Sequence, residues 1–208
     1  MFEIEDLKPD DVLIQAGNLN EGKVLFGDWL QGNWDLYADG YKVAADILVE
    51  QLEGNPQEDR LIFPVLFMYR HFVELKLKHL ILSLDRLSGT QISKEKFGKH
   101  HLSPLWIYVR EHLDCVGGEG NSAELFASLG ARIEELNQLD PDSMHFRYSH
   151  SKAFQEMAIP DSLSMSNLKG TMNKINNAFG LIEAGIDYEM EGRAIDAELE
   201  AEMRAESY

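Results

Sequence analysis

The stretch MYRHFVELKLKHL, residues 68–80, places an arginine, a histidine and a glutamate in an otherwise apolar helical pattern. Residues three and four apart share one face of a helix, so Glu74 can accept hydrogen bonds from both His71 and Arg70. Because an unpaired buried charge is costly, mutual pairing is the simplest explanation. Two interpretations stay open: an internal ion pair that fixes the helix in register, or a polar cluster at a cleft in which Glu74 orients His71 or a ligand.

A second polar group, formed by Arg147, Tyr148 and His150, lies in SMHFRYSHSK, directly after an Asp-Pro turn. Arginine binds phosphate through a bidentate fork, and histidine can transfer a proton near neutral pH. The pair Arg147 and His150 therefore suits RNA cleavage, although surface loops also carry such pairs without a catalytic role.

Histidines also precede the next expected helix, in KHHLSPLW. His100 and His101 stand where helix amides favour anions, and either could instead cap the helix or pack against it. His112 and Cys115 have the helical spacing of two metal ligands, but no second pair completes a zinc site. We therefore expect no metal and no other cofactor.

The charge of the chain is unevenly distributed. The formal net charge is −17, which argues against a general nucleic-acid coat protein. Residues 70–110, however, hold eight basic and three acidic side chains, whereas the rest of the chain holds 11 and 33. This basic island is either an anion site or a set of lysines that solvate one helix face.

Composition and length favour one soluble domain of ordinary size. Of the 208 residues 44% are hydrophobic, enough for a core, and a single cysteine excludes an internal disulfide framework. Neither a secretion signal nor an apolar run of membrane-spanning length is visible. These features predict a cytoplasmic protein that does not associate with membranes.

The apolar periodicity predicts an all-α fold, because strand signals are nearly absent. In the first helix the pattern is expected to bury Val43, Ala44, Ile47, Leu48 and Leu52, and the second helix, apolar around most of its circumference, is expected to be central. Helices are expected over residues 41–54, 59–89, 103–113, 122–139 and 162–192. We divide the chain into an irregular N-terminal arm, a helical domain and an acidic C-terminal tail, over residues 1–39, 40–190 and 191–208.

Three of these segments together resemble the HEPN superfamily of small α-helical domains, in particular bacterial members. The resemblance rests on YRHFVELKLKHLI, then HHLSPLW, then DPDSMHFRYS, and covers about residues 40–188. It implies an up-and-down bundle of four to five helices that forms a homodimer. It also implies that Arg70, His71, Glu74, His101, Arg147 and Tyr148 line one polar seam.

Many HEPN proteins are metal-independent RNases of toxin–antitoxin and anti-phage systems. The resemblance would assign Arg147 to phosphate or transition-state binding, and His150 to proton transfer during attack by a ribose 2′-hydroxyl. The family motif leaves four to six residues between its Arg and His, whereas RYSH leaves two. The expected function is therefore a module of a bacterial defence, toxin–antitoxin or regulatory system that dimerises and binds RNA, a nucleotide or protein. RNA cleavage by Arg147 and His150 is the alternative.

The acidic tail offers a surface for a protein partner. Positions 183–206 hold nine acidic residues against Arg193 and Arg204. Ala194, Ile195, Leu199 and Met203 could form an apolar stripe for a partner helix, and a solvated, frayed end is the other interpretation.

Overall fold

The computed structural model describes residues 33–54, 56–113, 122–148 and 162–206. Within these ranges the chain is all-α, which confirms the expected fold class. Its elements are α1 (Trp34–Gly54), η1 (Pro56–Leu61), α2 (Ile62–Ser88), α3 (Lys94–Phe97), α4 (Leu102–His112), α5 (Ser122–Leu139) and α6 (Met165–Glu206). None of the helices in these ranges is long and apolar enough to cross a membrane. His150 and Cys115 lie outside the described residues.

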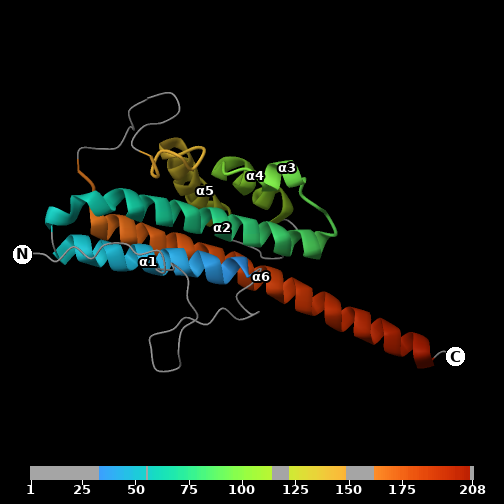
Figure 1. Cartoon of the computed structure of the whole chain (residues 1–208). Coiled ribbons are helices and arrows are strands. Elements are labelled where there is room, and N and C mark those ends of the chain that lie inside the picture. The colour runs from blue at the N-terminus through green and yellow to red at the C-terminus, as the bar shows by residue number, and fades with distance from the viewer. Residues whose placement is uncertain (1–32, 55, 114–121, 149–161, 207–208) are drawn as a thin grey trace, which may run out of the picture. The chain divides into compact units, whose positions relative to one another are not determined.

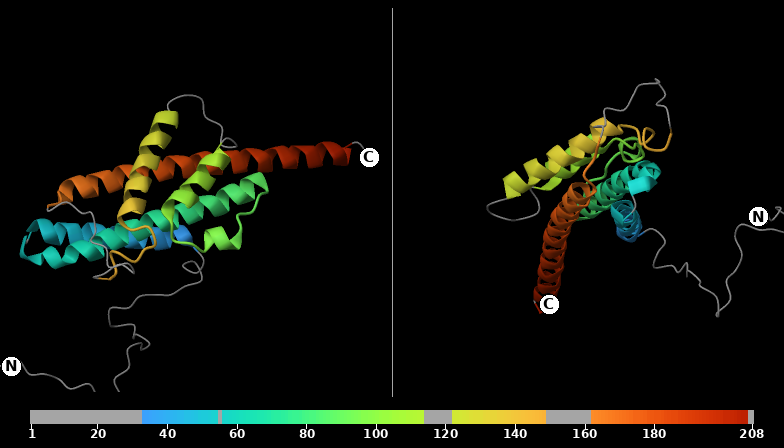
Figure 2. Two further views of the ribbon diagram at one scale, coloured as in Figure 1. Left: turned by 90° about the horizontal axis from the view of Figure 1, so that it is seen from above. Right: turned by 90° about the vertical axis from the view of Figure 1, so that its left-hand side faces the viewer.

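Helix α2 is the centre of the bundle, as its apolar circumference predicted. It runs alongside α1 and α6, while α4 and α5 lie across it at a steep angle (Figures 1 and 2). Tyr69, Phe72, Leu77 and Leu80 of α2 are completely buried. The helix ends at Gly89, whose φ of 69° is the left-handed conformation that glycine adopts without steric cost.

Helix α1 differs from its expected form in two ways. It begins at Trp34 rather than Tyr41, and Val43 and Ile47 are more than half exposed. Leu52 is buried as expected, and Ala38, Ala45 and Val49 form the rest of the buried face. Apolar residues occur on two faces of this helix, so periodicity alone does not identify the one that faces α2.

Helix α6 is a single element of 42 residues that joins the expected last helix to the acidic tail. Its N-terminal part packs in the bundle through Met172, Ile175, Phe179, Ile182 and Ile186. The C-terminal part extends beyond the other helices (Figure 1), and its side chains from 191 to 205 are exposed.

Helices α4 and α5 meet at Gly130, where the backbone of α5 approaches an indole ring. A Cβ atom at this position would lie 2.5 Å from Nε1 of Trp106, so alanine would push the ring aside. Gly130→Ala is expected to lower the free energy of unfolding by about 1–3 kcal/mol. Gly40→Ala is the matched control: a Cβ there meets nothing within 4 Å, and the change should raise stability by about 0.5–1 kcal/mol. Urea unfolding followed by circular dichroism measures both, and equal effects would contradict this packing.

Candidate functional site

Arg70 is a fully buried charge with no exposed surface, as is the carboxylate of Asp140. Four residues further along α2, Glu74 Oε2 accepts a hydrogen bond from Arg70 Nη1 at 2.9 Å. This is the local ion pair that the spacing predicted. It lies inside the bundle, since Glu74 is only 1% exposed.

The rest of the Arg70 guanidinium binds backbone carbonyls from distant segments. Nε donates to the carbonyl of Asp140 at 2.8 Å, and Nη2 donates to the carbonyls of His100 at 2.5 Å and Pro141 at 3.4 Å. One side chain therefore joins α2 to the segment entering α4 and to the turn leaving α5. Such charge-assisted bonds satisfy a guanidinium that would otherwise be costly to bury.

Glu74 in turn collects three further cationic or imidazole groups. Its Oε1 accepts from Lys78 Nζ and lies 2.9 Å from His100 Nδ1, while its Oε2 lies 3.9 Å from His71 Nδ1. Burial alone would raise the pKa of Glu74, but the interactions with His71, Lys78 and His100 outweigh burial and hold it far below its usual value. Glu74 is therefore an anion at neutral pH and a poor general acid.

The turn after α5 is organised by the carboxylate of Asp140. Its Oδ1 accepts from the backbone amides of Met144 at 2.7 Å and His145 at 2.9 Å, while Oδ2 lies 3.6 Å from Arg70 Nε. Ser143, buried within this turn, has a φ of 62°, an uncommon conformation for a residue other than glycine. Its carbonyl accepts from Nε of Arg147, so the turn sets the position of that arginine.

Arg147 lies at the surface within a group of rings that we call the aromatic patch: Tyr41, Phe67, His71, Arg147 and Tyr148. The guanidinium carbon of Arg147 lies 5.6 Å from the centre of the Phe67 ring and 5.9 Å from that of Tyr148. Phe67 stacks on His71 with centroids 5.6 Å apart, and the edge of Tyr41 meets the same imidazole at 4.5 Å. His71 therefore connects the exposed aromatic patch to the buried Glu74.

The structure brings together most of the residues expected at the seam, with His100 in the place expected for His101. Arg70, His71 and Glu74 meet as predicted, and Arg147 reaches them only through Phe67. His101 is exposed at the start of α4, and its neighbour His100 takes the expected place beside Glu74. The first backbone amides of α4 already have an acceptor inside the protein. Asn137 Oδ1 accepts from Leu102 N at 3.0 Å and from Ser103 N at 3.4 Å, in the position where an anion was expected to bind.

The basic island proves to be partly structural. Arg70, Lys76 and Lys78 are buried and paired inside the bundle. The exposed bases of the island are Arg86, Lys94, Lys96, Lys99 and Arg110. Three of these lysines lie on or next to α3, in the segment that leads to His100.

A second cluster, which sequence reasoning missed, surrounds the buried Lys76. Its Nζ contacts Asp35 and lies 3.2 Å from Glu183 Oε1, so it links α2 to α1 and α6. Asp35, His79 and Glu183 place one ligand atom each within 4.8 Å of one another, the arrangement of a small cation site. The ammonium of Lys76 already pairs with both Asp35 and Glu183, so we assign these carboxylates to structural pairing between the helices.

No family model, curated protein or solved structure matches this chain.

Replacing Glu74 tests the buried seam. Glu74→Gln leaves Arg70 and Lys78 buried without their carboxylate and should cost about 3–5 kcal/mol of stability at neutral pH. Because the folded state lowers the pKa of Glu74, its stabilisation is complete above the unfolded value of about 4.3 and is lost as the pH falls below it. The loss of stability on acidification should therefore be smaller in Glu74→Gln.

Urea unfolding between pH 3 and 7 measures both effects. Glu95→Gln is the control, because Glu95 forms an exposed pair with Lys99 and its loss should hardly change stability. A wild-type value for Glu74→Gln would show that the buried pairing does not support the fold.

Proposed function

We propose that this chain is a HEPN-like helical module of a bacterial defence, toxin–antitoxin or regulatory system that binds RNA at the aromatic patch. The observation that carries the proposal is the position of Arg147, exposed over the rings of Phe67 and Tyr148. Among the residues that the structure describes, no carboxylate lies within ion-pair distance of this arginine. Its guanidinium therefore keeps donors for a phosphate.

The chemistry of the patch suits a single-stranded nucleic acid. An arginine fork pairs with phosphate oxygens, and an exposed ring stacks on a base of any sequence. Tyr148 is 55% exposed and offers that ring. His71 and His100, both partly exposed, add imidazole groups beside it, and the lysines near α3 add positive charge along the approach to His100.

The buried seam supports the patch and is not the binding surface in this proposal. Arg70 donates its hydrogen bonds to Glu74 and to backbone carbonyls, and Lys78 donates to Glu74, so neither side chain is available to a ligand. A ligand would meet Arg147, Tyr148 and the outer edges of the histidines. The expected affinity is therefore modest and strongly dependent on salt.

RNA cleavage is the second candidate function. One observation favours it: His71 and His100 approach opposite oxygens of the same carboxylate, and both imidazoles are partly exposed. One neutral and one protonated imidazole could remove and supply the protons of 2′-hydroxyl attack, while Arg147 holds the phosphate. His150, the expected catalytic partner of Arg147, lies outside the described residues.

Removing the arginine should weaken RNA binding. Arg147→Ala is expected to raise the Kd for a short fluorescent single-stranded RNA at least about tenfold, and Tyr148→Ala to a similar degree through lost stacking. The slope of log affinity against log salt should also fall by about 0.7 for Arg147→Ala, since one phosphate contact is lost.

Arg110→Ala is the matched control, because Arg110 also lies over a ring, Phe126 at 4.9 Å, but on α4. Fluorescence anisotropy with RNA and with mononucleotides as competitors measures these effects. Equal affinity of wild type, Arg147→Ala and Arg110→Ala would exclude the patch.

Incubation of the bound RNA without metal separates binding from cleavage. The proposed binding function predicts intact RNA between pH 5 and 8. Cleavage that disappears in both Arg147→Ala and His100→Gln would instead establish the second candidate. Cleavage lost only in His150→Ala would assign proton transfer to the residue that the family resemblance suggested.

A further inference from the structure

Exposed apolar side chains form a stripe on α6 that begins beside the bundle and continues along the projecting part. Leu181, Tyr188 and Ile195 are spaced by seven residues and are 64%, 75% and 57% exposed. Leu199 and Met203 continue the same face, whereas Ala194 points elsewhere on the helix. A seven-residue apolar repeat is the pattern of a helix that packs against another helix.

Glycines accompany this stripe. Gly185 and Gly192 lie between its large residues, four positions after Leu181 and Tyr188. A glycine inside a helix costs about 0.5–1 kcal/mol relative to alanine. In the part of the chain that the structure describes, no atom lies within 4 Å of where a Cβ at Gly192 would stand, so no neighbour there requires glycine. Small residues between large ones allow a second helix to approach closely.

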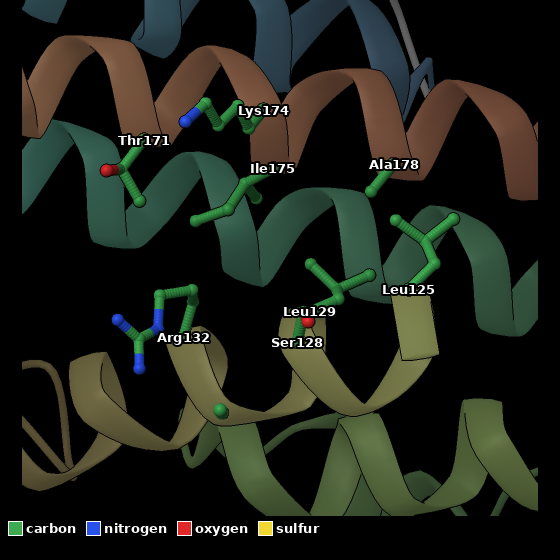
Figure 3. Close-up of a pocket in the computed structure, with 9 residues that line it drawn as sticks. Leu125, Ser128, Leu129, Arg132, Thr171, Lys174, Ile175 and Ala178 are labelled. Atoms are coloured by element: carbon green, nitrogen blue, oxygen red, sulfur yellow. The ribbon is translucent and has the colours of Figure 1, made fainter. Parts of the chain in front are cut away.

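The N-terminal half of the same helix borders a groove of about 420 Å³ against α5. Leu125, Leu129, Ile175 and Ala178 form its apolar surface, and Figure 3 shows Arg132 on α5 and Lys174 on α6, on the two sides of the groove. The groove therefore combines an apolar lining with a rim that carries two bases, Lys174 and Arg132, and the guanidinium of Arg132 also pairs with Glu135 at 3.3 Å.

The projecting segment of α6 has the complementary character. Residues 187–206 carry eight acidic and two basic side chains beside the apolar stripe. Yet this segment cannot reach the groove of its own molecule. It continues the same helix whose N-terminal half borders the groove, and it points away from it (Figures 1 and 2). The acidic segment of α6 can therefore lie in such a groove only on another molecule.

We propose that two copies of the chain associate through antiparallel α6 helices, each acidic segment lying along the α5–α6 groove of the other copy. With the two-fold axis at Tyr188, Leu181 faces Ile195 of the second copy and Lys174 faces its Glu202, by equal spacing from the axis. The antiparallel direction matters, since parallel pairing would align the two acidic segments side by side. This dimer goes beyond the proposed RNA binding and does not depend on it.

Sedimentation equilibrium of the full chain tests the surface. Wild type is expected to be a dimer at micromolar concentration, and Ile195→Glu and Leu199→Glu should each weaken dimerisation at least about tenfold. Ile47→Glu is the control, because Ile47 is 53% exposed on α1. Circular dichroism checks that all three variants keep their helices, and Arg147→Ala should still dimerise.

Cysteine crosslinking tests the direction of pairing. In a Cys115→Ser background, a mixture of Leu181→Cys and Ile195→Cys chains should form a mixed disulfide dimer, whereas each variant alone should form little. Lys174→Glu should weaken the dimer, and mixing it with Glu202→Lys should restore a mixed dimer.

Several results would overturn the inference: a monomer at all concentrations, efficient crosslinking of Ile195→Cys with itself, or a dimer that Ile47→Glu disrupts and Leu199→Glu does not.

Discussion

The burial of the Arg70 guanidinium is the constraint on which the arrangement of the bundle depends. A charge with no access to water must have every donor satisfied, and its partners are Glu74 on the same helix and carbonyls from two distant segments. Neither distant segment can move without leaving a donor unpaired. The entry to α4 and the turn at Asp140 are therefore held against α2, and the exposed position of Arg147 follows from that turn.

The helices could be predicted where a regular spacing of apolar residues is followed by a residue that ends a helix, such as glycine or proline. Helix α5 was expected over residues 122–139 and occupies that range, because the Asp140-Pro141 pair ends it. Helix α2 ends at the expected glycine. The prediction of α1 was less accurate. Val43 and Ile47 follow the period of a buried face, but which face of α1 is buried depends on the side chains that α2 presents to it. Tertiary contacts make that choice, and no local pattern contains it.

The candidate site was likewise predictable only in part from the sequence. The pair of Arg70 and Glu74 follows from helical spacing, and the same rule would have found Lys78, four residues after Glu74. The contributions of His100 and Asp140 come from 26 and 70 residues away and have no local signal. Two adjacent histidines are indistinguishable in sequence, and only the path of the chain into α4 decides that His100 turns inward while His101 faces solvent.

His100 couples the surface of the protein to its buried interior. Its carbonyl binds Arg70 and its ring binds Glu74, while about half of the side chain remains in contact with water. Any ligand that captures this imidazole competes directly with a buried carboxylate. Part of the intrinsic affinity is then consumed in releasing Glu74, and by thermodynamic reciprocity a change in the interior alters the affinity at the surface to the same extent.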